Sequence, residues 1–138
     1  MSNRTFTIIK PDSVRKGNSG KIISRLEAEG YKILALRKVA LSQKQAEAFY
    51  GVHRERPFFS NLVKYMTSGP VYIAALQRDN AVGHLRKVMG ATDPLKAEAG
   101  TIRKDFGESI EQNAIHGSDS DENANIEIAF FFSQSELL

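Results

Sequence analysis

Residues 113–120 read NAIHGSDS and hold the histidine with the most distinctive surroundings in the chain. The stretch predicts that His116 lies in a polar turn, after a short apolar piece that predicts a brief strand and before a helix. A histidine is a good nucleophile toward phosphorus when one ring nitrogen is free and the other is held. Gly117 allows close backbone approach or a positive φ, and Ser118 can fix the turn by local hydrogen bonds. Taken alone, however, a lone histidine is more often a surface or structural residue.

A helix is expected directly after this stretch. Ser120 can cap it, and Asp121 and Glu122 place carboxylates in its first turn, where they suit the helix dipole. Glu127 lies in the same predicted helix and could reach back to orient the ring of His116. The stretch and its helix together predict a held, nucleophilic imidazole.

Upstream of the stretch, strand and helix patterns alternate. Runs rich in β-branched and apolar residues predict three strands, at residues 5–10, 31–41 and 71–76. Cap residues and apolar spacing predict four helices: one that Asn18 or Ser19 caps and Gly30 ends, one that begins at the capping box of Ser42 and Gln45, one between Pro57 and Gly69, and one that Asn80 caps and Gly90 ends.

Residues 90–112 show little periodicity, and irregular stretches of this length in a compact domain are often functional. The expected order is β-α-β-α-α-β-α-loop-β-α, which is a split βαβ arrangement. We therefore predict an α+β, ferredoxin-like (βαββαβ) sandwich with an antiparallel sheet covered by helices. We expect residues 1–138 to form a single domain.

Composition excludes several classes of protein. The chain has no cysteine, which rules out disulfides, thiol catalysis and cysteine-ligated zinc and agrees with a reducing cytoplasm. No secretory signal is visible, and the longest apolar runs are far shorter than the ~18–20 residues of a membrane span. The net charge of +3 is spread along the chain without a basic tail. Such an excess suits a small polyanion such as a nucleotide, although ordinary solubility explains it equally well.

The stretch at residues 113–120 resembles N-x-x-H-G-S-D-S, the active-site signature of nucleoside diphosphate kinases, at every defined position. Asp93 stands where the family commonly has Asn, and Val52 is apolar where relatives often carry a polar side chain. Other segments that resemble the family, in the family's order, are residues 8–12, 56–70, 90–94 and 100–106.

The resemblance implies a ping-pong transfer of the γ-phosphoryl group from a nucleoside triphosphate to a nucleoside diphosphate through a phosphohistidine at His116. It also implies low base selectivity, and Mg²⁺ that is bound mainly through the nucleotide phosphates rather than by a protein metal site. We expect a cytoplasmic homo-oligomer, tetrameric or hexameric, without membrane or nucleic acid as a main partner. Since helices are expected on one face of the sheet, its edge strands and irregular segments are the natural contact surfaces.

The expected site residues fall into two overlapping groups. A lysine offers a point charge and an arginine a fork for phosphate oxygens, while an exposed aromatic ring can stack on any base. Alone, each would more often be an ordinary surface or core residue, and the resemblance raises it above that interpretation. Tyr65 is too far along its helix to be assigned a role. The catalytic group is His116, Lys10, Arg103, Glu127 and Ser118, and the nucleotide-binding group is Lys10, Tyr50, Phe58, Arg86, Thr92, Arg103 and Asn113.

Two rival functions stay open at this point. A non-catalytic nucleotide- or nucleic-acid-binding protein on the same fold would keep the basic and aromatic residues but would not need His116. A histidine phosphocarrier would need the histidine but no base-stacking residue. The presence of both sets favours the kinase. Residues 17–21 only superficially suggest a P-loop, because the glycine spacing is wrong and Ile22 stands where Ser or Thr is required.

Overall fold

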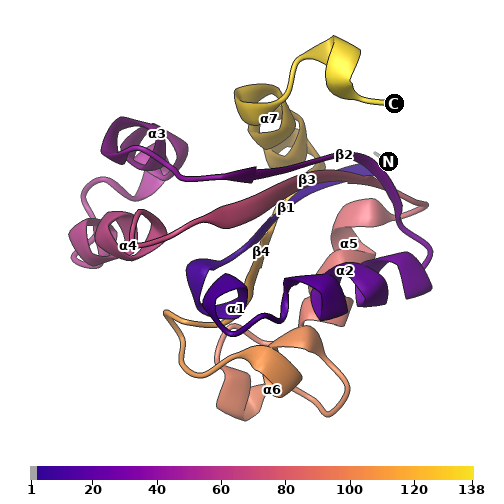
Figure 1. The fold of residues 1–138 in the computed structure, drawn as a ribbon, viewed down its shortest axis with the longest axis horizontal. Coiled ribbons are helices and arrows are strands. Elements are labelled where there is room, and N and C mark those ends of the chain that lie inside the picture. The colour runs from indigo at the N-terminus through magenta and orange to yellow at the C-terminus, as the bar shows by residue number, and fades with distance from the viewer. Residues whose placement is uncertain (1–2) are drawn as a thin grey trace.

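The computed structural model describes residues 3–138 and is built around one four-stranded sheet (Figure 1). The strand order is β2-β3-β1-β4, and all three neighbouring pairs are antiparallel. This is the predicted ferredoxin-like order, with β1 in the middle and the short β4 at one edge. The strands are β1 (Arg4–Ile9), β2 (Lys32–Val39), β3 (Val71–Gln77) and β4 (Ile115–Gly117).

Helices lie on both sides of this sheet (Figure 1). In addition to the α-helices there are three short 3₁₀ turns: η1 (Gly51–His53), η2 (Pro94–Lys96) and η3 (Gln134–Glu136). None of the helices within residues 3–138 is long and apolar enough to cross a membrane. The α-helices are α1 (Pro11–Arg15), α2 (Ser19–Ala28), α3 (Gln43–Phe49), α4 (Phe59–Met66), α5 (Ala81–Met89), α6 (Ile102–Phe106) and α7 (Asp121–Phe131).

Side chains alternate along the central strands between two hydrophobic cores. On β1, Phe6 and Ile8 belong to a core that includes Ile128 of α7, and Ile9 belongs to a second core with residues of α2 and α5. The expectation of helices on one face only was therefore wrong. The central strands carry apolar residues at successive positions, as in Ile8 and Ile9, and both faces need cover.

Most predicted helix starts are confirmed. The Ser42 capping box is present at α3, and Ser120 accepts a hydrogen bond from the N–H of Asn123 at the start of α7. Asn18 and Asn80 occupy N-cap positions, but neither side chain makes a capping hydrogen bond, and Asn80 is left-handed with φ 53°. These two starts are set by backbone geometry and packing rather than by the cap that the sequence suggested.

Two short helices were not predicted. Helix α1 begins at Pro11 directly after β1, and α6 lies inside the stretch expected to be irregular, where Thr101 caps it. Each has five residues, which is too short to show helical periodicity. Both matter for the site, because α1 follows Lys10 and α6 carries Arg103.

Candidate active site

His116 lies at the middle of the edge strand β4, paired with Ile8 of the central strand β1, so the expectation that it lies in a polar turn was wrong. The three-residue strand is held by pairing with β1, which the local sequence does not reveal. Its side chain is 22% exposed. Aromatic rings surround it edge-on, with centroid separations of 5.6 Å to Phe49, 6.4 Å to Tyr50 and 6.3 Å to Phe6. The imidazole is thus held in an apolar, partly enclosed position at the rim of the sheet.

One ring nitrogen of His116 is held by a carboxylate. Its Nε2 lies 3.0 Å from Oε1 of Glu127 on α7. Ser118 donates to the same oxygen at 2.8 Å and accepts from the backbone N–H of Phe6 at 3.3 Å. With Glu127 ionised, Nε2 carries the hydrogen and Nδ1 carries the lone pair. Within residues 3–138 no hydrogen-bond partner lies at Nδ1, which is the arrangement of a nucleophile.

Lys10 lies at the end of β1, in contact with the segment that leads into β4. Its ammonium donates to Oδ1 of Asn113 at 2.8 Å, and the amide of Asn113 donates to the carbonyl of Thr92 at 3.0 Å. Lys10 is 8% exposed. Burial, and then the positive charge of Arg103, lowers the pKa of Lys10 to about 8. Three predicted site residues are therefore joined in one chain of hydrogen bonds.

Arg103 approaches the same region from α6. Its guanidinium donates to the carbonyls of Gly90 at 3.2 Å and Ile115 at 2.8 Å, while its Nε is buried without a partner in residues 3–138. Burial, and then the charge of Arg86 on α5, lowers the pKa of Arg103 to about 10. Arg86 is exposed. Lys10, Arg103 and Arg86 thus form a cluster of cations in which Arg103 lowers the pKa of Lys10 and Arg86 lowers the pKa of Arg103, and a bound anion would relieve this repulsion.

Gly117 lets β4 pack closely against α5. A Cβ at this position would lie 2.9 Å from side-chain atoms of Leu85 and Met89, both of which are buried. Close approach, rather than a positive φ, is therefore the reason for this glycine. Gly90 differs, because it has φ 87° and a Cβ there would also meet Thr101 at 2.6 Å. It ends α5 and presents the carbonyl that Arg103 binds.

The two aromatic candidates occupy different environments. Tyr50 is buried beside His116, and its hydroxyl has no hydrogen-bond partner in the described chain. Burial, and then the charge of Glu127, raises the pKa of Tyr50, which keeps the hydroxyl protonated. Phe58, at the start of α4, is 47% exposed, and its ring centroid lies 5.4 Å from that of His53. Tyr50 therefore adjoins the histidine, whereas Phe58 offers a ring face at the surface.

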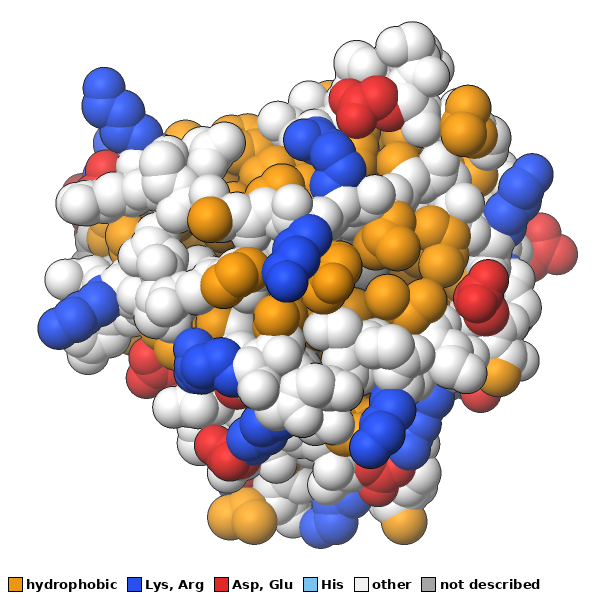
Figure 2. Space-filling model, viewed as in Figure 1, with side chains coloured by type: hydrophobic (Ala, Val, Ile, Leu, Met, Phe, Trp, Pro, Cys, Tyr) orange, Lys and Arg blue, Asp and Glu red, His pale blue; other side chains and the backbone are white. Residues whose placement is uncertain are grey.

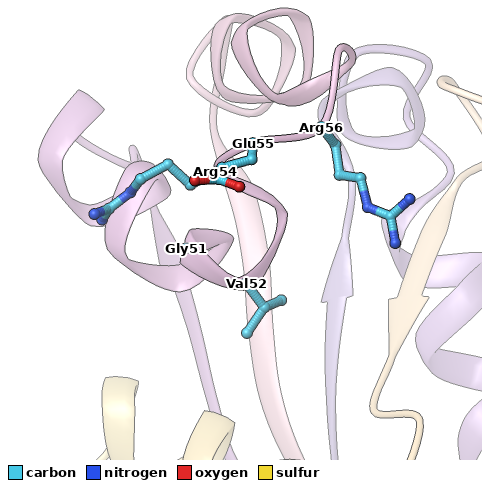
Figure 3. Close-up of a pocket in the computed structure, with 5 residues that line it drawn as sticks. All are labelled: Gly51, Val52, Arg54, Glu55 and Arg56. Atoms are coloured by element: carbon cyan, nitrogen blue, oxygen red, sulfur yellow. The ribbon is translucent and has the colours of Figure 1, made fainter.

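Two surface hollows adjoin these residues. One lies in the turn between Tyr50 and Phe58 and is lined by residues 51, 52 and 54–56, with Arg54 and Arg56 pointing away from each other (Figure 3). The other is lined by Arg86, Gly90 and Thr101 among others, at the end of α5. The loop beside Phe58 and the loop beside Arg86 are both open to solvent.

Sequence reasoning missed Asp12 and Tyr65. Asp12 is 1% exposed and is hydrogen-bonded to the hydroxyl of Tyr65 and to the backbone N–H of Ala114, two residues before His116. The sequence holds only a weak signal for this link, an acidic residue directly after Lys10 and a proline. The partners are far apart in the chain, so no local pattern connects them.

A family model described as nucleoside diphosphate kinase matches residues 3–137. The chain belongs to this family. A nucleoside diphosphate kinase of Granulibacter bethesdensis is 60% identical over 135 residues, which cover 98% of this chain and 96% of that protein. One from Nitratiruptor sp. is also 60% identical over 135 residues, with 98% of each chain covered.

Solved structures agree with this assignment. The nucleoside diphosphate kinase of Aquifex aeolicus superposes with a TM-score of 0.97 at 44% identity, and all of both chains is covered. A halophilic nucleoside diphosphate kinase from Halobacterium salinarum in complex with CDP gives 0.95 at 39% identity, covering 100% of this chain and 92% of that one. The resemblance, the fold class and the activity predicted from the sequence are confirmed. This nucleoside diphosphate kinase family member transfers γ-phosphoryl groups between nucleotides.

Proposed function

We propose that this family member carries the phosphoryl group on Nδ1 of His116. The observation that supports this most directly is the pairing of Nε2 with Glu127 at 3.0 Å, which leaves the lone pair on Nδ1. Ser118 holds the same carboxylate oxygen and fixes its direction. In this proposal His116 is the nucleophile, and Glu127 and Ser118 orient it.

The reaction consists of two half-reactions, and the second restores the free histidine. Nδ1 of His116 attacks the γ-phosphorus in line, the bond from that phosphorus to the β,γ-bridging oxygen breaks, and the nucleoside diphosphate leaves. The resulting phosphoimidazole is cationic at its ring, and the carboxylate of Glu127 stabilises that charge through Nε2–H. A terminal phosphate oxygen of a second nucleoside diphosphate then attacks the phosphorus, and Nδ1 leaves with its lone pair restored.

Positive charge on the protein stabilises the transferring group. Lys10, Arg103 and Arg86 surround one region, and Asn113 holds the ammonium of Lys10 in place. Phosphoryl transfer depends mainly on positioning and on neutralising oxygen charge. The hydroxyl of Tyr50 has no partner within residues 3–138 but is buried, so its contact with the nucleotide stays a prediction. We assign Thr92 a nucleotide contact, because it is exposed and its carbonyl accepts the amide of Asn113, which holds Lys10.

Magnesium fits this site as a companion of the substrate. Across residues 3–138 no group of three or more His, Asp and Glu is arranged to hold a metal ion, and the carboxylate beside His116, that of Glu127, is engaged by the histidine and Ser118. Mg²⁺ would therefore be held by the nucleotide phosphates and water, which suits its reluctance to dehydrate. When bound there, it adds positive charge to the phosphate chain.

The nucleotide base is proposed to stack on Phe58. Its half-exposed ring can accept any base, because every base has a π-face, so low base selectivity is expected. The CDP bound by the Halobacterium salinarum relative supports nucleotide binding by this chain. The single-domain organisation, the homo-oligomer and the cytoplasmic location remain predictions.

Exchange kinetics test the proposal against its rivals. With ATP as donor and GDP as acceptor, a phosphohistidine intermediate gives parallel double-reciprocal lines, and label from γ-labelled ATP reaches GTP. A non-catalytic binder would bind ATP without transferring label. A phosphocarrier would take label only from a phosphorylated protein partner and would not pass it to GDP. Either of those results would contradict the proposal.

A further inference from the structure

The segment directly before His116 has the least usual backbone geometry of the site. Ala114 has φ 76°, and with Asn80 it is one of two non-glycine residues of positive φ within residues 3–138. The N–H of Ile115 donates to the carbonyl of Asn113 at 2.9 Å, which closes a three-residue γ-turn around Ala114. A residue with a Cβ keeps this conformation only where its surroundings impose it.

Groups from the junction of β1 and α1 hold this turn from both sides. The backbone N–H of Lys10 donates to the carbonyl of Ala114 at 2.9 Å. Oδ2 of Asp12 accepts the N–H of Ala114 at 3.1 Å. Since Asp12 is 1% exposed, its carboxylate cannot exchange this partner for water. Both backbone polar groups of Ala114 are therefore fixed.

The second oxygen of Asp12 is held by α4. The hydroxyl of Tyr65 donates to Oδ1 of Asp12 and accepts the backbone N–H of Asp12 at 2.9 Å. Tyr65 is 8% exposed. Burial, and then the hydrogen bond to Asp12, raises the pKa of Tyr65, so the hydroxyl keeps its proton. Asp12 thus joins α4 to the γ-turn at Ala114, which lies 102 positions after Asp12 in the chain.

The turn connects two halves of the site. On its N-terminal side, Asn113 accepts the ammonium of Lys10. On its C-terminal side, the carbonyl of Ile115 accepts the guanidinium of Arg103, and His116 follows. A change of φ at residue 114 would rotate one half of the site relative to the other.

We propose that Asp12 and Tyr65 form a positioning pair for phosphoryl transfer. They hold the γ-turn at Ala114, so that His116 and the surrounding cations face one phosphorus atom. Neither side chain needs to touch the substrate. The inference rests on the proposed role of His116, because it concerns the geometry of that nucleophile. Small displacements of reacting groups lower rates strongly even where binding is retained.

Tyr65→Phe tests the pair, since it removes one hydroxyl and keeps the ring. The rate of phosphohistidine formation at saturating ATP should fall about tenfold, as displacement of a nucleophile predicts. The dissociation constant for ADP should change little, because the pair does not contact nucleotide. Tyr31→Phe is the matched control: it also removes a buried hydroxyl, one that donates to the carbonyl of Ala81, away from the site. Its rate should stay close to wild type.

Ala114→Gly supplies a rescue that a merely structural role would not show. Glycine adopts a positive φ without help, so it should need the pair less. In the Tyr65→Phe background, Ala114→Gly should recover part of the lost rate although it adds no contact. Three results would each overturn the inference. The first is a rate for Tyr65→Phe equal to that of Tyr31→Phe, and the second is a loss of ADP affinity in Tyr65→Phe as large as its loss of rate. The third is no recovery of rate when Ala114→Gly is added.

Two further outcomes are separable. If Tyr65→Phe cannot be purified folded, Asp12→Asn preserves the shape of the side chain but leaves one acceptor oxygen for two donors, the hydroxyl of Tyr65 and the N–H of Ala114. A wild-type rate in that variant would overturn the inference. A wild-type protein that forms no phosphohistidine would instead contradict the proposed role of His116. The variants are interpreted only against that wild-type measurement.

Discussion

Lys10 is a residue whose charge the fold brings close to the neutral pH range. It is 8% exposed, it is hydrogen-bonded to Asn113, and its pKa is lowered to about 8, first by burial and then by Arg103. At neutral pH it is still mostly protonated, so it can neutralise phosphate oxygens. A small rise in pH is enough to remove that charge from the free enzyme.

The value of kcat/KM should therefore fall as pH rises past about 8. Bound phosphates favour the ammonium, so the corresponding limb of kcat should lie at higher pH.

Unfolding is not the cause of this fall in kcat/KM, since the pKa of Lys10 in the folded protein lies below its value of about 10.4 in the unfolded chain. Between these values the unfolded chain binds more protons, and the free energy of unfolding contributed by Lys10 rises with pH. Activity and thermal unfolding measured across this range check both signs; constant kcat/KM up to pH about 10 would contradict the account.

Arg103→Ala should lower kcat/KM, and the loss of transition-state stabilisation that this ratio measures should be at least about 2 kcal/mol, the usual value for a charge-assisted contact. Arg25→Ala is a matched control, because Arg25 pairs with Asp105 on the same helix as Arg103 and lies outside the site. Steady-state kinetics of both variants measure the difference. Equal values would show that Arg103 acts only as a support for the carbonyls that it binds.

At the scale of elements, packing places β4. The strand has three residues, and its position depends on Gly117 fitting against α5 and on backbone pairing with β1. The sequence predicted two of the helix starts with side-chain caps, at Ser42 and Ser120, because capping is local. It did not predict α1 or α6, although Thr101 caps α6, since five residues are too short to show helical periodicity.

The same distinction explains which parts of the site could be predicted. His116, Ser118 and Glu127 lie within twelve positions and share one hydrogen-bonded group, so a local motif suggested them. Asp12 and Tyr65 are 53 positions apart and meet only when α4 packs against α1. Tertiary contacts of that kind leave no trace in periodicity or spacing.

Gly117→Ala should lower the free energy of unfolding by about 1–3 kcal/mol, the usual cost of overpacking a filled core. The added methyl group would press on Leu85 and Met89, which cannot move into solvent because both are buried. Gly20→Ala is the control, since no atom lies within 4 Å of a Cβ at that helix position. Denaturant unfolding should show Gly20→Ala at least as stable as wild type. A Gly117→Ala variant of equal stability would contradict the packing described for β4.

At the scale of the whole molecule, one edge of the sheet is only partly paired: the backbone N–H of Leu138 donates to the carbonyl of Leu34 on β2 at 3.1 Å. Strand β2 is an edge strand, and Leu36 on it is 40% exposed. Figure 2 shows hydrophobic side chains gathered across the middle of the face that carries β2, with Lys and Arg side chains spread around them. Because helices cover both faces of the sheet, this edge and the loops are the surfaces left for assembly.

We expect a homo-oligomer, tetrameric or hexameric, because an exposed strand edge with apolar side chains is stabilised by pairing with another copy. Light scattering across a range of concentrations measures the mass. A multiple of the 15.3 kDa chain is the expected result. A mass of one chain at every concentration would refute assembly while leaving the chemistry of the site intact.

The central claim is that Nδ1 of His116 carries the phosphoryl group, and its location after reaction with ATP alone tests this most directly. The chain offers a matched control in His84, whose Nε2 also faces a carboxylate, Glu29, at 2.8 Å. Phosphorus NMR and peptide mapping should place one phosphoryl group on Nδ1 of His116 in the wild type and in His84→Gln, and none in His116→Gln. Label that persists in His116→Gln, or that is found on Nε2, would contradict the account.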